Sequence, residues 1–133
     1  MQIFSKELEL DLSLRWARIQ SIMSASGVDA LIVSDNTSLC YVSDRVFGGV
    51  AYIPAEGKPI FCVRRPVGLE GDTVAYMRKV EDIPSILAQR GYAQPTKIAL
   101  EGDVATYGEY IRLQKAFGLD DSATSGAATT ILR

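Results

Sequence analysis

The chain contains no histidine, and this absence limits the chemistry that its residues could carry out. Histidine is the commonest general base near neutral pH and the commonest metal ligand in proteins. Catalytic Ser-His-Asp and Cys-His arrangements are therefore excluded within these 133 residues. The serines Ser34, Ser38 and Ser43 have no base to activate them, and turn and helix-capping roles account for them. We expect no catalytic residue in this chain.

The two cysteines, Cys40 and Cys62, are too few for a disulfide framework or for an all-cysteine zinc site, which needs four thiolates. Both lie among apolar residues in the sequence. Because free cysteine is one of the most frequently buried residue types, we expect two buried, reduced thiols.

Four acidic residues lie near the ends of expected strands: Glu101, Asp103, Asp120 and Asp121. Strand ends are where α/β sheets bind ligands, and clustered carboxylates hold Mg²⁺ in phosphoryl-transfer and nuclease sites. However, no expected strand carries a carboxylate in its interior, which a two-metal site needs. Solvated loop carboxylates and helix caps are the simpler interpretation, so no metal site is expected in this chain.

Three large side chains, Tyr41, Arg45 and Phe47, lie on an expected loop that ends at a Gly-Gly pair. Arginine and aromatic residues are over-represented at binding hot spots, so this loop is a candidate binding segment. The alternative is a surface loop with one buried aromatic residue. A second basic feature, Arg64-Arg65, is either an ordinary exposed pair or a contact for a carboxylate or an acidic partner.

Length and composition are those of one globular domain, with 47% hydrophobic and 23% charged residues. The net charge of −2 argues against a nucleic-acid partner, which would favour a basic surplus. No apolar run approaches the length of a membrane span, and the N-terminus lacks the basic flank and apolar core of a signal peptide. We therefore expect a cytoplasmic protein with no membrane partner.

The first element that must position these residues is an amphipathic helix over residues 11–26, preceded by an arm or a frayed helix start over residues 1–10. Its apolar side is predicted by four residues at helical spacing: Leu12, Trp16, Ile19 and Met23. Its polar side is expected to face solvent largely through Arg15, Arg18 and Gln20. Gly27 suits the end of this helix, and the apolar run over residues 30–33 predicts a strand buried on both faces.

Strands and helices alternate along the rest of the chain. The expected elements are a short helix over 37–42, strands over 50–53 and 60–63 in an antiparallel hairpin, a helical turn over 67–71, a strand over 73–80, a helix over 83–90 capped by Asp82, a strand over 97–100, a helix over 107–117 with a Thr106/Glu109 capping box, an edge strand over 121–124 and a helix start over 127–133. This order predicts a three-layer α/β fold, with a mixed sheet of about five or six strands and helices on both faces.

Several of these segments resemble the N-terminal domain of the creatinase/prolidase/Xaa-Pro aminopeptidase family. Members typically begin with an Arg-containing helix and a Gly-x-Asp-Ala entry to the first strand, as in LRWARIQSIMSASGVDALIV at residues 14–33. An Asn...Tyr-Leu-Thr-Gly-like segment follows in the family, and residues 36–44 read NTSLCYVSD. KIALEG at 97–102 is similar to the family's Ile-Gly-Val-Glu strand, and TILR at 130–133 resembles the end of the domain.

The resemblance implies a ribonuclease-H-like fold for residues 1–133, as a single creatinase/prolidase N-terminal-type domain. It also implies a C-terminal "pita-bread" catalytic domain, which is expected outside this chain. Residue 133 is expected to lie at the boundary between the two domains. The catalytic domain holds two divalent metal ions through Asp, Asp, His, Glu and Glu ligands. By the same resemblance, Tyr41, Arg45 and Phe47 form a substrate-access or dimer loop. The expected partners are the chain's own catalytic domain, a second copy in a homodimer and the peptide substrate.

The resemblance therefore implies the non-catalytic N-terminal domain of a metal-dependent Xaa-Pro aminopeptidase or prolidase-like peptidase. Creatinase-like members place an Arg after Phe-Gly in the loop, whereas Gly49 follows Phe47-Gly48 here, which favours a proline-peptide hydrolase or an inactive relative. The first alternative is a protein-interaction module of a catalytically inactive relative. The second is an independent ribonuclease-H-like nuclease.

Overall fold

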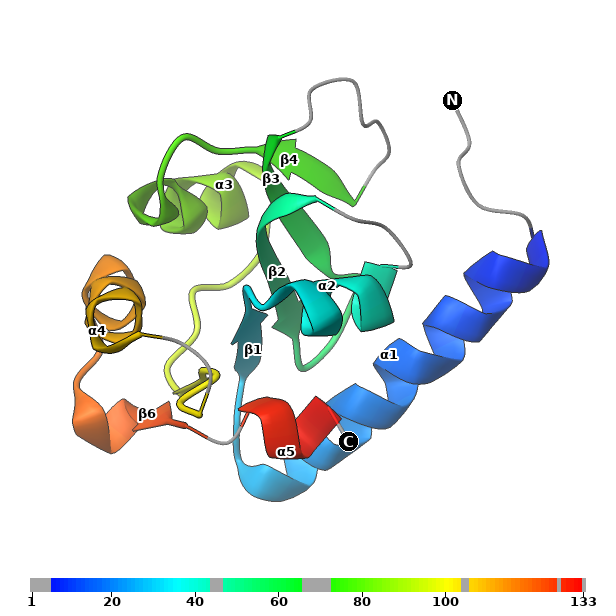
Figure 1. Ribbon diagram of the computed structural model, residues 1–133. Coiled ribbons are helices and arrows are strands. Elements are labelled where there is room, and N and C mark those ends of the chain that lie inside the picture. Colours follow the sequence, from blue (N-terminus) through cyan, green and yellow to red (C-terminus); the bar gives the residue numbers. More distant parts are fainter. Residues whose placement is uncertain (1–5, 44–46, 66–72, 104–105, 127, 133) are drawn as a thin grey trace.

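The computed structural model describes residues 6–43, 47–65, 73–103, 106–126 and 128–132 (Figure 1). In chain order the elements are α1 (Lys6–Ser26), β1 (Ala30–Val33), α2 (Asn36–Ser43), β2 (Gly48–Pro54), β3 (Ile60–Arg65), β4 (Val74–Tyr76), the 3-10 turn η1 (Val80–Asp82), α3 (Ile83–Gln89), β5 (Ile98–Ala99), α4 (Tyr107–Ala116), the 3-10 turn η2 (Asp121–Ala123), β6 (Thr124–Ser125) and α5 (Ala128–Leu132).

The strands form one mixed sheet of six strands in the order β4-β3-β2-β1-β5-β6. β2 pairs antiparallel with β1 and with β3, which confirms the expected hairpin. The pairs β3–β4, β1–β5 and β5–β6 are parallel. β1 lies near the centre of the sheet with all its residues buried, as its continuous apolar run predicts.

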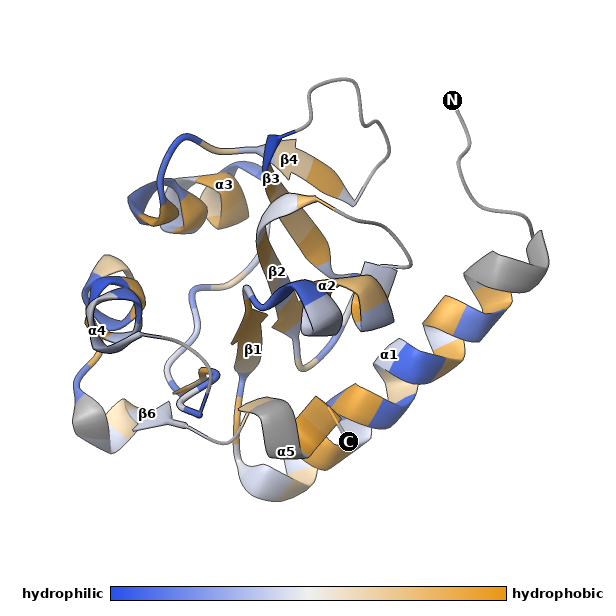
Figure 2. Cartoon of the chain, viewed as in Figure 1, coloured by the Kyte–Doolittle hydropathy of each residue, from blue (hydrophilic) through white to orange (hydrophobic). Residues whose placement is uncertain are grey.

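Helices cover both faces of the sheet, which confirms the three-layer α/β prediction. On one face, α1, α2 and α5 pack against Leu31 and Val33 of β1. On the other, α3 and α4 pack against Ala30 and Ile32, because successive side chains of a strand point to opposite faces. Figure 2 shows the result, with hydrophobic central strands and hydrophilic residues on the outer sides of the helices.

The long helix α1 forms as its apolar spacing predicts, although it begins at Lys6 rather than near residue 11. Leu12, Ile19 and Met23 are fully buried, and Trp16 is partly buried against the same cluster. Gly27 ends the helix with a φ of 72°, a conformation that glycine adopts readily. No helix within the described ranges is both long and apolar enough to cross a membrane.

The capping box at the start of α4 is confirmed. The Thr106 hydroxyl accepts a hydrogen bond from the Glu109 amide at 3.1 Å, and the Glu109 carboxylate accepts one from the Thr106 amide at 3.3 Å. Asp82 occupies the N-cap position of α3 as predicted, but its carboxylate makes no capping bond. It accepts hydrogen bonds from the preceding amides of Arg78 and Lys79 at 2.9 and 3.2 Å instead. These bonds belong to the turn that leads into η1 and α3.

Three other expected elements differ from the prediction. The strand expected over 73–80 is shortened to β4, because the turn bonded by Asp82 follows it. The strand expected over 97–100 covers only Ile98–Ala99. The edge strand expected over 121–124 is a 3-10 turn followed by the two-residue strand β6. The helical turn expected over 67–71 lies outside the described residues.

The two cysteines lie in different surroundings. Cys62 is buried in β3 as expected, and burial raises the pKa of its thiol to about 12. The expectation for Cys40 is wrong, because this residue is exposed. Leu39 and Val42 take the buried side of α2, and Cys40 lies between them on the side that faces solvent.

Candidate functional site

The loop predicted to carry the site begins at Tyr41 and ends at Phe47. Tyr41 lies in the last turn of α2 and is 36% exposed. Phe47 is buried, with its ring centroid 6.0 Å from that of Phe61 in an edge-on contact, so it is the buried aromatic of the alternative interpretation. Arg45 lies outside the described residues. Tyr41 is therefore the candidate that the structure places at the surface.

Tyr41 lies beside two arginines of α1. The Arg18 guanidinium donates a hydrogen bond to the Tyr41 hydroxyl at 2.7 Å. The guanidinium carbons of Arg15 and Arg18 lie 5.2 and 5.9 Å from the centre of the Tyr41 ring. A guanidinium within about 6 Å of an aromatic ring is attracted to its π face, so α1 holds this ring in place.

The carbonyl groups at the end of α2 are bonded by side chains of α1. Arg15 donates to the Tyr41 carbonyl oxygen, and the Trp16 indole N–H donates to that of Val42, both at 2.8 Å. The last carbonyls of a helix have no partner within the helix, and α2 has no basic residue in its own last turn. The positive charge of Arg15 also interacts favourably with the negative end of the helix dipole.

Glu101 holds the other end of α2. It directly follows Leu100, beside the parallel pair β1–β5, and is only 2% exposed. Its Oε1 accepts hydrogen bonds from the amides of Ser34 and Asp35 at 2.6 and 3.0 Å. The carboxylate of Asp35 then accepts from the Thr37 amide at 3.2 Å, as an N-cap residue does. A helix of eight residues is marginal on its own, and α2 is held at both ends from outside.

The same cluster reaches the last helix of the chain. Besides the Tyr41 hydroxyl, the Arg18 guanidinium donates a hydrogen bond to the carbonyl oxygen of Leu132 at 2.7 Å. One side chain of α1 therefore joins the end of α2 to the end of α5.

The other candidate residues are not brought together. Asp103 is exposed, the Asp120 carboxylate accepts hydrogen bonds from the amide and hydroxyl of Ser122 at 3.1 and 2.6 Å, and nothing is described for the side chain of Asp121. No group of three potential metal ligands is found in the part of the chain that the structure describes. Arg64 and Arg65 are exposed at the end of β3, with Arg65 opposite Gly48, where the candidate loop enters β2.

Sequence reasoning missed the residues that hold α2. Arg15, Arg18 and Gln20 were expected largely at the solvent side of α1, yet each donates to the backbone of another element, Gln20 to the carbonyls of Pro54 and Gly57 at 2.8 Å. The local signal for such partners is a short helix with no basic residue in its last turn. That signal indicates that the last carbonyls of the helix need hydrogen-bond donors from elsewhere, but not which element provides them.

Among its described residues, this arrangement can position a loop but supplies no paired nucleophile and base. Its charged and aromatic groups bind each other and the ends of helices. What these contacts provide is a fixed position for the Tyr41 ring at the surface.

Comparison with protein families gives one match. The model described as "Creatinase/Prolidase N-terminal domain" matches residues 15–133. A search of curated proteins finds no match.

Solved structures share the fold at low sequence identity. An Xaa-Pro aminopeptidase (aminopeptidase P) structure from Streptococcus thermophilus has a TM-score of 0.69 at 18% identity, covering 92% of this chain and 98% of that one. The N-terminal domain of the cytoplasmic peptidase PepQ from Mycobacterium tuberculosis has a TM-score of 0.67 at 20% identity, covering 90% and 98%.

An Xaa-Pro dipeptidase from Bacillus anthracis has a TM-score of 0.68 at 17% identity. The match covers 92% of this chain and only 36% of that enzyme, so residues 1–133 correspond to about a third of its length.

Proposed function

The chain belongs to the creatinase/prolidase N-terminal domain family, and from this premise we propose that it is the non-catalytic N-terminal domain of an Xaa-Pro aminopeptidase or prolidase-like peptidase. Its role is to shape the access of a peptide substrate to a catalytic domain outside residues 1–133. The observation that carries this proposal is that α2 is held at both ends, by Glu101 and by Arg15 and Trp16, so that Tyr41 is presented at the surface.

The metal chemistry of such a peptidase belongs to the catalytic domain. The two divalent ions that the family implies would be held there, by ligands that lie outside residues 1–133. The contribution of residues 1–133 is to position the segment after Tyr41 and to contact the catalytic domain. A cytoplasmic location belongs to the same proposal.

The first test compares residues 1–133 with the complete product of the gene. We expect the complete protein to hydrolyse an Xaa-Pro peptide when Mn²⁺ or Co²⁺ is added, and residues 1–133 alone to show no hydrolysis with either ion. Hydrolysis by residues 1–133 alone, or a gene whose product lacks the family's five metal ligands, would contradict the proposal.

The access role has its own test in the complete protein. Tyr41→Ala removes the presented ring, and we expect it to raise KM by about threefold or more while kcat changes less. Tyr107→Ala is the matched control, because Tyr107 is 82% exposed on α4, away from this cluster. A Tyr41→Ala protein with unchanged KM would rule out a role for this residue in access.

Dimerisation is the second part of the proposal and is supported by α1. Leu10 and Leu14 are each 63% exposed and lie one turn apart, on the side of the helix opposite Leu12 and Ile19. The proposed occupant of this stripe is a second copy of the chain. We expect sedimentation equilibrium to give a dimer for the unaltered protein and a monomer for the Leu10→Lys/Leu14→Lys variant; a monomer in both would contradict it.

The same stripe supports the alternative function, a protein-interaction module in a catalytically inactive relative. The complete gene product distinguishes the two functions. If it keeps the two-domain length but lacks the metal ligands, and remains inactive with added metal, the interaction module is the better assignment.

A further inference from the structure

Arg18 of α1 bonds two other helices through a single nitrogen atom. Its Nη2 donates hydrogen bonds to the Tyr41 hydroxyl and to the Leu132 carbonyl oxygen, both at 2.7 Å. The hydrogens of a guanidinium lie in one plane at fixed angles. If either acceptor moves, the guanidinium must turn to follow it, and the bond to the other acceptor is then bent or lengthened. The Tyr41 ring and the end of α5 are therefore linked through one rigid group.

The backbone and the ring of Tyr41 are held by different arginines. Arg15 donates to the Tyr41 carbonyl oxygen at 2.8 Å and pairs with Asp11 of its own helix at 2.6 Å. Arg18 instead bonds the hydroxyl at the far end of the ring. Loss of the Arg18 guanidinium should therefore release the ring, while Arg15 still holds the end of α2.

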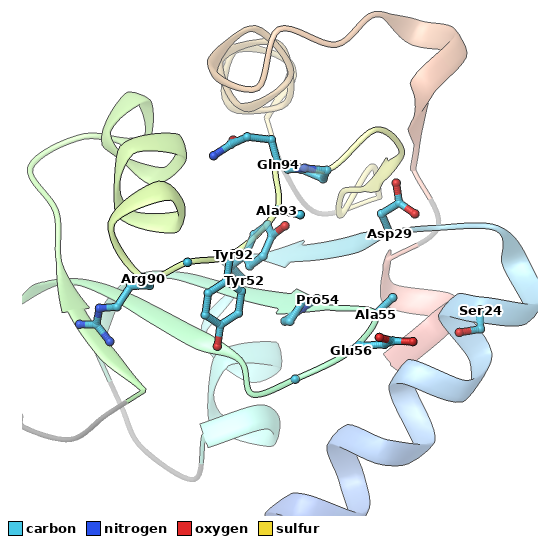
Figure 3. Close-up of a pocket in the computed structure, with 13 residues that line it drawn as sticks. Ser24, Asp29, Tyr52, Pro54, Ala55, Glu56, Arg90, Tyr92, Ala93 and Gln94 are labelled. Atoms are coloured by element: carbon cyan, nitrogen blue, oxygen red, sulfur yellow. The ribbon is translucent and has the colours of Figure 1, made fainter.

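The starts of α2 and α5 are joined as well, through the two residues that follow β5. The Leu100 carbonyl accepts the Ala128 amide at 3.1 Å, at the start of α5. The next residue, Glu101, accepts the two amides that precede α2. α5 also lies alongside α1, as both Figure 1 and Figure 3 show. Because α2 and α5 are joined at their starts and again at Arg18, they are held relative to each other at both ends.

We propose that Arg18 is a positioning residue, which sets the Tyr41 ring according to the position of the end of α5. In the proposed function, on which this rests, Tyr41 faces the peptide substrate and the chain continues beyond α5 into the catalytic domain. A movement of that domain displaces the Leu132 carbonyl, and the Arg18 guanidinium transmits the displacement to the ring. The position of the catalytic domain thereby adjusts how the substrate is received.

The simpler interpretation is a surface arginine that only adds a little stability, as exposed charged contacts usually do. Val42 and Leu132 belong to the same apolar cluster, so a change at the end of α5 could reach α2 through side-chain packing alone. The two interpretations differ in one respect. Packing transmits a change at Leu132 whether or not Arg18 is present, whereas positioning by Arg18 requires its guanidinium.

The deciding experiment uses residues 1–133 with ¹³C-labelled tyrosine rings and follows the resonances of Tyr41. Leu132→Ala, with Leu132→Val as the milder change, disturbs the end of α5, because the Leu132 side chain is buried in the core. We expect both substitutions to shift the Tyr41 resonances, and the shifts to be about threefold smaller or less when Arg18→Gln is also present. Equal shifts with and without Arg18, or unshifted Tyr41 resonances while the amides of α5 shift, would overturn the proposal.

Arg90 provides a matched control, because it follows α3 on the other face of the sheet. It lines the pocket drawn in Figure 3, and its guanidinium donates to the Val74 carbonyl oxygen at 2.6 Å. Arg90→Gln thus removes the same kind of bond from a different place. We expect Tyr41 to respond to Leu132→Ala as fully in this background as in the unaltered one. An equal loss of response in both arginine variants would indicate general loosening and would contradict a specific role for Arg18.

The complete protein provides the kinetic readout. We expect Arg18→Gln to raise KM by about threefold or more with a smaller change in kcat, and to add little to Tyr41→Ala, since both act on one ring. Arg18→Lys keeps the charge without the planar fork and should restore only part of the loss. Additive effects of Arg18→Gln and Tyr41→Ala would contradict positioning through Tyr41. If Tyr41→Ala alone leaves KM unchanged, the access role fails, while the ring resonances of residues 1–133 still decide whether Arg18 links α5 to Tyr41.

Discussion

At the scale of single residues, Gly49 is a position where the fold leaves no room for a side chain. It lies at a bulge in β2 with a φ of 157°, and a Cβ placed there would come within 2.0 Å of the Cys62 carbonyl oxygen in β3. No flexible side chain can move aside to relieve that contact, because both partners are backbone.

We expect Gly49→Ala to lower the free energy of unfolding by about 2–4 kcal/mol, measured by urea denaturation. Gly108→Ala is the control, because a Cβ at Gly108 meets nothing within 4 Å. This substitution in α4 should raise stability by up to about 1 kcal/mol. Equal stability of the two variants would show that the strand relaxes around the new methyl group.

Glu101 is a second residue whose side chain the fold depends on, because its carboxylate is buried and bonds two backbone amides. Its Oε2 is buried without a hydrogen-bond partner, while Oε1 accepts the amides of Ser34 and Asp35. Burying a carboxylate that is hydrogen-bonded through only one oxygen lowers the stability of the fold. The two bonds that Oε1 does make hold the amides just before α2.

We expect Glu101→Ala to cost about 1–3 kcal/mol, because it leaves two amides without an acceptor. Glu101→Gln keeps an acceptor oxygen and should cost less. Amide hydrogen exchange supplies the local measurement, with faster exchange at residues 34–39 than in α4. An alanine variant as stable as the glutamine variant would mean that water replaces the carboxylate.

At the scale of elements, α2 depends on α1. Trp16→Phe keeps an aromatic ring beside Phe61 but removes the N–H that bonds the Val42 carbonyl. We expect a loss of about 1 kcal/mol and faster amide exchange in α2. Tyr107→Phe, at an exposed site, is the control and should change neither. If α2 exchanges no faster in Trp16→Phe, the Arg15 contact alone is sufficient.

Elements defined by local pattern were predictable from the sequence. The buried side of α1, the continuous strand β1 and the capping box of α4 follow from residues that are neighbours in sequence. The predicted partners of polar side chains were wrong where the actual partner belongs to another element or turn. The Asp82 carboxylate bonds two preceding amides and not the first turn of α3, although Asp82 is the N-cap residue. Arg15 and Arg18 bond residues more than twenty positions away. The spacing of neighbouring residues gives no information about which distant group a polar side chain bonds.

The candidate site shows the same division. Tyr41 and Phe47 could be selected as large residues of one loop, but sequence alone did not separate the exposed ring from the buried one. That separation depends on Phe61 of β3, which contacts Phe47, and on the α1 arginines beside Tyr41.

At the scale of the whole molecule, Asp29 joins two distant parts of the chain. It precedes β1, and its carboxylate binds the amides of Thr96 and Lys97 just before β5. The pKa of Asp29 is lowered in the folded state, so its contribution to stability is present above the unfolded pKa and is lost as pH falls through the folded one.

We therefore expect Asp29→Asn to be less stable than the unaltered chain at pH 7. The difference should shrink as pH falls below about 5, measured by thermal unfolding at a series of pH values. Asp11→Asn, which alters an exposed ion pair on α1, is the control and should cost less than about 1 kcal/mol at pH 7. A difference for Asp29→Asn that stays constant with pH would mean that hydrogen-bond geometry, and not charge, accounts for it.

The candidate loop has fixed points on both sides, with Tyr41 and Val42 bonded by α1 before it and Phe47 buried after it. We therefore expect a substitution or insertion at positions 44–46 to leave the core contacts on either side intact, and, under the proposed access role, to alter substrate preference. Under the same proposal, related chains would differ in specificity through this short stretch alone. The same property makes residues 44–46 the natural place to graft a designed recognition sequence.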